Sequence, residues 1–154
     1  MLLKPKVGIG RAVAAALALL AFCVAAAAGK EATVEELKAR LASASGGDRV
    51  GLCIQIAERQ LAAADKLYSA DEVEEARPAL DDVVSFSEQA RDYSIQSRKH
   101  QKQTEISVRK MARKLGDIKR TVTHEEQVTV QAAIDRLQRV RDDLLAAMFP
   151  KGAK

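Results

Sequence analysis

An unbroken helical register over residues 73–122 most constrains the fold of this chain. Spacings of three and four continue there without a slip through Val73, Ala76, Leu80, Val83, Ser87, Ala90, Ser94, Ser97, Gln101, Thr104, Val108, Met111, Leu115, Ile118 and Val122. This spacing places the side chains on one face of an α-helix. Because no glycine or proline lies between Pro78 and Gly116, no local signal ends the helix. The simplest prediction is one helix over about residues 71–120, ~75 Å long at 1.5 Å per residue.

The middle of this register is small or polar, from Ser87 to Thr104, whereas both ends are apolar. A uniform coiled coil needs a continuous apolar seam, so we expect different helices to cover the two ends. The alternative is a break near residues 96–103, which would give two stacked helices.

Capping boxes mark three helix starts, one of which is the start of the long helix. In each, a Ser or Thr precedes a Glu by three residues, and the pairs are Thr33 with Glu36, Ser69 with Glu72, and Thr123 with Glu126. Turn residues at 43–47 end a first helix over about 33–43. A second helix, which Asp48 can cap, covers about 48–68, and the last helix covers about 123–148, before Pro150.

The composition favours an all-α fold. Ala, Leu, Glu, Lys, Arg and Gln dominate, aromatic residues make up 3%, and tryptophan is absent; these residues are mostly helix formers. We predict an elongated helical bundle built on the long helix over about residues 71–120. Two helices would pack on its first half, and the C-terminal helix would pack antiparallel on its second half.

Residues 1–28 have the pattern of an export signal. Three cations, Lys4, Lys6 and Arg11, precede an apolar run over residues 12–25, and three alanines precede Gly29. This order predicts cleavage near Ala28. An uncharged span of 17 residues is at the short limit for crossing a bilayer, so an N-terminal membrane anchor is the less favoured alternative.

Removing the signal changes the charge and the cysteine content. The remaining 126 residues, 29–154, suffice for a single all-α domain, and 22 Lys and Arg against 21 Asp and Glu lower the net charge from +4 to +1. Cys53 is then the one remaining cysteine, which excludes an intramolecular disulfide. Its apolar neighbours predict a small buried side chain.

The segment Lys66-Leu67-Tyr68-Ser69-Ala70-Asp71-Glu72-Val73-Glu74-Glu75-Ala76-Arg77-Pro78-Ala79-Leu80 resembles the turn region of a tetratricopeptide helical hairpin. The resemblance implies a helical hairpin over about residues 48–90. Peptide binding in that family needs at least ~3 stacked repeats, and the chain holds no second copy, so binding is not carried over. The alanine-rich, helical, exported chain is also similar in general character to small helical proteins of the periplasm.

No residue pattern in the chain supports catalysis or a cofactor. The two histidines, His100 and His124, have no neighbouring His or Cys with which to build a zinc site. Met111 and Met148 lie on apolar stripes, where methionine fills gaps, and no haem-attachment motif occurs. Ser97 and His100 share a helical face but lack an acid to complete a triad. We therefore predict a protein that is not an enzyme and binds no metal or cofactor.

Charge is strongly segregated along the chain. Residues 58–88 hold nine acids and three bases, whereas residues 91–120 hold ten bases and three acids. Five of these bases would lie within about 60° of arc on a continuous helix, opposite the apolar seam, namely Arg98, Lys102, Arg109, Arg113 and Arg120. They form a candidate surface for an anionic partner, although a solvated helix face is the simpler interpretation.

We therefore expect an exported, non-enzymatic helical interaction or structural protein of the bacterial cell envelope, periplasmic or secreted. Its partner would be a protein or an anionic envelope component. The sequence also leaves open whether the chain forms a homo-oligomer. Nucleic acid is disfavoured because no aromatic residues interleave with the bases. The alternative is a holdase-type chaperone or adaptor, with the polar seam from Ser94 to Thr104 at the mouth of its cleft.

Overall fold

The computed structural model describes residues 31–152, which form five α-helices and no strand. Residues 33–152 belong to one compact unit. The predicted signal and its cleavage position lie outside the described residues. Within residues 31–152, every helix is too short or too polar to cross a membrane. The predicted all-α fold is confirmed.

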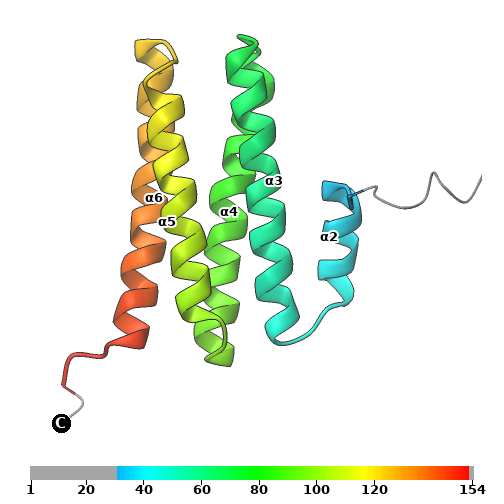
Figure 1. Cartoon of the computed structure of the whole chain (residues 1–154), viewed down its shortest axis with the longest axis vertical. Coiled ribbons are helices and arrows are strands. Elements are labelled where there is room, and N and C mark those ends of the chain that lie inside the picture. The colour runs from blue at the N-terminus through cyan, green and yellow to red at the C-terminus, as the bar shows by residue number, and fades with distance from the viewer. Residues whose placement is uncertain (1–30, 153–154) are drawn as a thin grey trace, which may run out of the picture. The chain divides into compact units, whose positions relative to one another are not determined.

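Four helices form two antiparallel hairpins, and a short helix lies beside the first hairpin (Figure 1). The helices are α2 (Val34–Ser43), α3 (Gly47–Ser69), α4 (Val73–Ser97), α5 (Gln101–Lys119) and α6 (His124–Met148). α3 packs along α4, and α5 packs along α6. The predicted antiparallel packing of the C-terminal helix on residues 104–122 is therefore confirmed.

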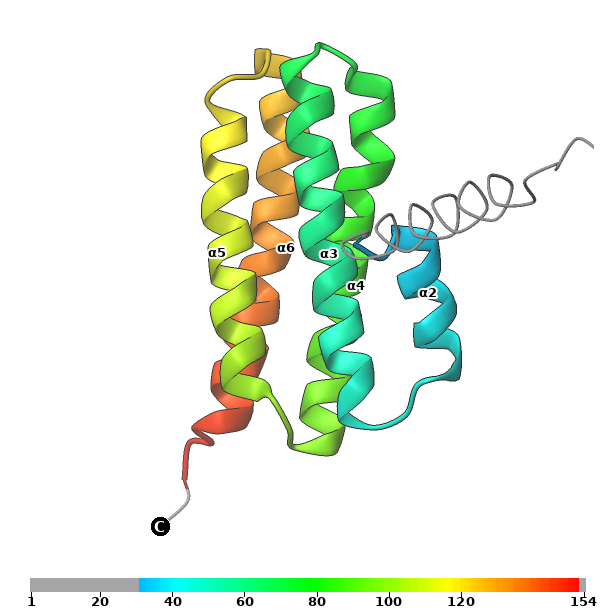
Figure 2. The same ribbon diagram turned by 45° about the vertical axis from the view of Figure 1, so that its right-hand side comes forward.

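The two hairpins stack so that helices running in the same direction meet. α4 packs on α6 and α3 on α5 (Figure 2). One apolar core joins all four helices, with fully buried side chains that include Ala57, Leu80, Leu115 and Leu137. α2 packs on α3, and its Leu37 is buried. Lys38 of α2 reaches Asp82 of α4 at 2.9 Å.

The prediction of one continuous helix over residues 71–120 is wrong. α4 ends at Ser97 and α5 begins at Gln101, so the alternative of a break near residues 96–103 is correct. Arg98 and His100 adopt left-handed backbone angles, with φ of 56° and 61°. The Ser94 hydroxyl donates to the Lys99 carbonyl at 2.7 Å. Ser94, in the polar middle of the register, therefore satisfies a backbone carbonyl of the turn between α4 and α5.

Burial explains why the chain turns back where no glycine or proline directs it. Two left-handed residues cost about 1–2 kcal/mol each. The turn brings Val108, Leu115 and Ile118 into the same core as Leu80 and Val83, and full burial of one such side chain contributes about 1.5–3 kcal/mol. A handful of buried residues therefore outweighs the strain of the turn.

The predicted helix starts agree with the structure in part. The Thr33–Glu36 capping box is present in both directions. The Ser69–Glu72 box is wrong, because Ser69 ends α3, and α4 begins at Val73 without a side-chain cap. Asp48 does not cap α3, which begins at Gly47. Thr123 accepts from the Glu126 N–H at 3.4 Å, but the Glu126 side chain turns into the bundle.

Candidate functional site

Three of the five predicted anion-binding residues lie on one exposed face of α5. Lys102, Arg109 and Arg113 are exposed, opposite the buried face that carries Val108 and Leu115. The other two lie at the ends of this helix. Arg98 stands in the turn before α5, and Arg120 is the residue after its last turn. The break at residues 98–100 thus removes the single continuous stripe that the register predicted.

Ion pairs separate these cations into two groups. Arg109 Nε lies 3.9 Å from Glu105 Oε1, and Arg120 pairs with Asp117. Five exposed cations of the turn and α5 have side chains with no ion pair or hydrogen bond among residues 31–152. We call these five residues the basic surface: Arg98, Lys99, Lys102, Lys110 and Arg113. Sequence reasoning missed Lys99 and Lys110, because only the fold shows which charges have partners.

Contacts between the two hairpins neutralise part of the segregated charge. Lys114 of α5 lies 2.8 Å from Asp65 of α3, and this partner raises the pKa of Lys114. Arg136 of α6 lies 2.8 Å from Glu88 of α4. The acidic first hairpin and the basic second hairpin thus complement each other, and the five cations of the basic surface take no part in these pairs.

Two buried carboxylates also join the helices. Glu126 is 3% exposed and accepts from the Tyr68 hydroxyl at 3.2 Å and from Arg77 Nε at 3.1 Å. This contact links α6 to α3 and α4. Burial and the nearby Glu126 carboxylate raise the pKa of Tyr68 to about 12. Glu105 of α5 similarly accepts from Arg141 Nε of α6 at 2.9 Å.

These carboxylates have a structural role in the described fold. Every buried side-chain nitrogen and oxygen among residues 31–152 has a hydrogen-bond partner, as is usual for a folded interior. The capping signature at residues 123–126 pointed to Glu126 as a cap, and the network with Tyr68 and Arg77 could not be foreseen from it. The partners lie 58 and 49 residues away in the chain.

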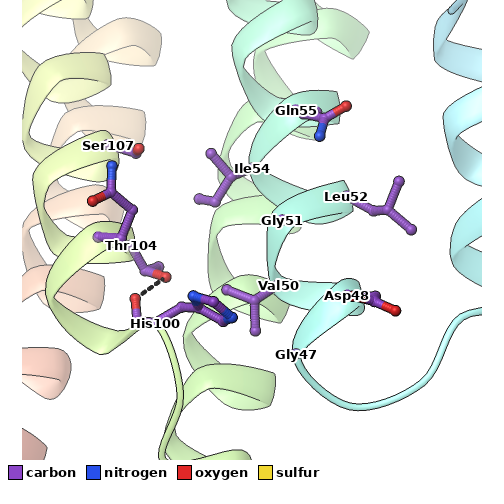
Figure 3. Close-up of a pocket in the computed structure, with 11 residues that line it drawn as sticks. Gly47, Asp48, Val50, Gly51, Leu52, Ile54, Gln55, His100, Thr104 and Ser107 are labelled. Carbon is purple, nitrogen blue, oxygen red and sulfur yellow. Dashed lines mark hydrogen bonds between the residues drawn. The ribbon is translucent and has the colours of Figure 1, made fainter.

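A groove of about 470 Å³ separates the first halves of α3 and α5. Figure 3 shows Ile54 of α3 pointing toward α5, with Val50 one turn below it. The His100 ring closes the lower end of the groove, where its Nε2 would lie 3.0 Å from a Cβ placed on Gly47. Thr104 and Ser107 form the opposite wall.

The polar seam predicted as the mouth of a cleft is divided by the turn. Ser94 is fully buried, and its hydroxyl is hydrogen-bonded to the Lys99 carbonyl. Thr104 donates to the His100 carbonyl at 2.8 Å and lines the groove. The groove therefore adjoins the second half of the seam, and its wall on α3 comes from residues 47–55, which the register argument did not include.

Other candidate chemistry is sparse in the described part of the chain. Residues 31–152 contain no group of three His, Cys, Asp or Glu side chains that could hold a metal ion. Cys53 is a free thiol with no exposed surface, and burial raises its pKa to about 11. A thiol in this state is a poor nucleophile. The prediction that Cys53 is a small buried side chain is confirmed.

Comparison with known protein families, characterised proteins and solved structures yields no significant match for this chain. The groove and the basic surface are therefore interpreted from their own geometry and charge.

Proposed function

We propose that this protein is an exported, non-enzymatic helical interaction protein of the bacterial cell envelope that binds an anionic partner through the basic surface. The observation that carries the proposal is the absence of ion-pair partners for Arg98, Lys99, Lys102, Lys110 and Arg113, in a described fold that pairs several of its other charges between the two hairpins. Cations without partners keep their full attraction for an approaching anion.

The positions of these cations support one contact surface. Lys102, Lys110 and Arg113 fall within about 80° of arc on α5 at 3.6 residues per turn. Arg98 and Lys99 directly precede this helix in the turn. An extended anionic chain or an acidic protein face could contact all five at once.

Export is the second part of the proposal and rests on the pattern of residues 1–28. The expected mature protein begins at or near Gly29. N-terminal sequencing of the protein from the exported fraction tests this part. A chain that retains Met1 in the membrane fraction would favour the anchored alternative instead.

Binding to immobilised heparin, used as a model polyanion, tests the basic surface. We expect the mature protein to bind at low salt and to elute as salt rises, since a Debye length of ~8–10 Å near physiological ionic strength screens exposed charges. Changing all five residues of the basic surface to Gln should abolish binding and preserve helicity, because Gln is nearly as good a helix former.

Two control variants distinguish this surface from general basicity. Arg40, Lys66, Arg139 and Lys151 are exposed cations outside the basic surface, and their joint change to Gln should leave most of the binding. The Arg109→Gln, Arg120→Gln double variant should do the same, because Glu105 and Asp117 already engage these side chains. Equal loss in all three variants would contradict the proposal.

A further inference from the structure

The end of α6 leaves apolar side chains in solvent. Among residues 31–152, three large apolar side chains are exposed, and two of them are Leu145 and Phe149, with exposed fractions of 37% and 71%. The Phe149 N–H donates to the Leu145 carbonyl at 2.9 Å, and Met148 lies three residues from Leu145 on the same side of the helix. Single exposed apolar residues are ordinary, but these three neighbours form a patch, which we call the apolar end.

A hollow with a cationic wall adjoins the apolar end. It has a volume of about 680 Å³ and lies where the start of α5 meets the last turn of α6 (Figure 2). Arg98 and Lys102 supply its charge, and Ile106 and Met148 supply apolar surface. Among the described residues, no Asp or Glu lines this hollow. The lining of the groove between α3 and α5, in contrast, includes no Lys or Arg.

The electrostatics of the hollow favour an anion. Arg98 and Lys102 belong to the basic surface, so neither side chain has an ion-pair partner among residues 31–152. α5 begins here without a side-chain cap and without an acid in its first turn, and the positive end of its dipole adds to the attraction. Because Met148 belongs to both features, an anion in the hollow would lie beside the apolar end.

The surface of an anionic membrane presents both kinds of partner together, since its charged headgroups lie directly above hydrocarbon. Lys and Arg beside Phe and Leu are typical of protein segments that bind at this interface. We infer that this end of the second hairpin binds the surface of a membrane that contains anionic phospholipids. Arg98 and Lys102 contact headgroup phosphates, while Leu145 and Phe149 lie among the upper acyl chains. The inference rests on the proposed function, because it names the lipid surface as the anionic partner.

The spacing along α6 fits this contact. The exposed Asp142 lies seven residues before Phe149, which is about 10 Å along a helix. Interfacial segments bury their apolar side by ~5–10 Å, so Asp142 stays at the headgroup level when Phe149 is inserted. A soluble polyanion would engage the same cations but would leave Phe149 in water.

Sedimentation of the mature protein with lipid vesicles tests the inference. One set of vesicles is phosphatidylcholine alone, and in the other phosphatidylglycerol replaces part of the phosphatidylcholine. We expect binding to the anionic vesicles at low salt and little binding to the neutral ones. Equal binding to both sets, or no binding to the anionic set, would overturn the inference.

The Leu145→Ser, Phe149→Ser double variant tests the apolar contact. Its affinity for anionic vesicles should fall about tenfold, which corresponds to about 1.4 kcal/mol, while heparin binding stays unchanged because heparin offers no hydrocarbon. Val128→Ser is the matched control, since Val128 is 67% exposed but lies about 30 Å from Phe149 along α6. It should leave vesicle binding unchanged, and an equal loss in both variants would contradict the contact.

The Arg98→Gln, Lys102→Gln double variant tests the hollow. Each cation near an anionic membrane contributes about fivefold in affinity, or about 1 kcal/mol, so vesicle binding should fall by more than tenfold. The matched Arg40→Gln, Lys66→Gln variant removes two exposed cations elsewhere in the described unit and should change vesicle binding much less. Circular dichroism checks that all variants keep their helicity.

The two proposals fail in different ways. If heparin binds through the basic surface but anionic vesicles do not bind, or if Leu145→Ser, Phe149→Ser leaves vesicle binding unchanged, only the membrane inference is overturned. If changing the basic surface to Gln leaves heparin binding intact, the proposed function fails, and with it the role of Arg98 and Lys102 in the hollow.

Discussion

Glu126 illustrates how one residue can join three helices. Its carboxylate is buried and accepts from Tyr68 of α3 and Arg77 of α4. The hydrogen bond to Glu126 also raises the pKa of the Arg77 guanidinium. Because Arg77 is partly exposed, water can solvate it if the carboxylate is lost, which limits the expected effect of a substitution.

Glu126→Ala should lower the free energy of unfolding by about 1–3 kcal/mol, since it leaves the Tyr68 hydroxyl and Arg77 without their buried acceptor. Urea unfolding followed by circular dichroism measures the change. The neighbouring Glu125 is exposed, and Glu125→Ala should change the value by no more than about 0.5 kcal/mol. Similar losses in both variants would argue against the network.

Burial of Cys53 should make the free energy of unfolding fall at alkaline pH. Its pKa rises from 9.0 to about 11 in the folded protein, chiefly through burial, so the fold favours the neutral thiol. The contribution of the neutral thiol to the free energy of unfolding is fully present below pH 9 and is lost as the pH rises through 11. Between these values, Cys53→Ala should lose less stability than the wild-type chain in urea unfolding. Parallel losses would show that the thiol does not contribute.

At the scale of the element, the turn between α4 and α5 decides the topology. Arg98 has a left-handed φ of 56°, a conformation that glycine adopts without strain. Arg98→Gly should therefore raise the free energy of unfolding by about 1 kcal/mol. In a continuous helix the same change would lower it by about 1 kcal/mol, so the sign of the effect distinguishes the two structures.

Lys110 provides the matched position within a helix. It is an exposed residue of α5, and Lys110→Gly should lower the free energy of unfolding by about 1 kcal/mol. Thermal or urea unfolding of both variants gives the comparison. Destabilisation by both glycines would contradict the turn at residues 98–100.

At the scale of the whole described unit, the two hairpins share one core. The buried cluster includes Leu80 of the first hairpin and Leu137 of the second, so we expect them to unfold together. The chain has two tyrosines and no tryptophan, and Tyr68 and Tyr93 both lie in the first hairpin. Tyrosine fluorescence therefore reports on one hairpin, while circular dichroism reports on all helices.

Leu137→Ala, a change in the second hairpin, should lower the free energy of unfolding by about 2–5 kcal/mol. Because the core is shared, the tyrosine signal should shift by the same amount as the circular dichroism signal. A tyrosine transition that stays at the wild-type midpoint would show instead that the hairpins unfold independently.

The amino-acid sequence by itself determined the helical class, the register of buried residues and several helix ends. Spacings of three and four correctly placed Leu80, Val108 and Leu115 in the core, because the helical repeat is a local property of the backbone. The Thr33 cap and the burial of Cys53 followed from neighbouring residues for the same reason.

Only the tertiary structure decided where the long register breaks and which charges find partners. No residue between Pro78 and Gly116 signals a turn locally, and the left-handed residues at 98 and 100 are stabilised by burial of the two apolar ends in one core. The partners of Lys114, Glu126 and Glu88 are distant in the chain. Such pairings arise from the stacking of the hairpins, so the basic surface and the groove could be defined only once the fold was known.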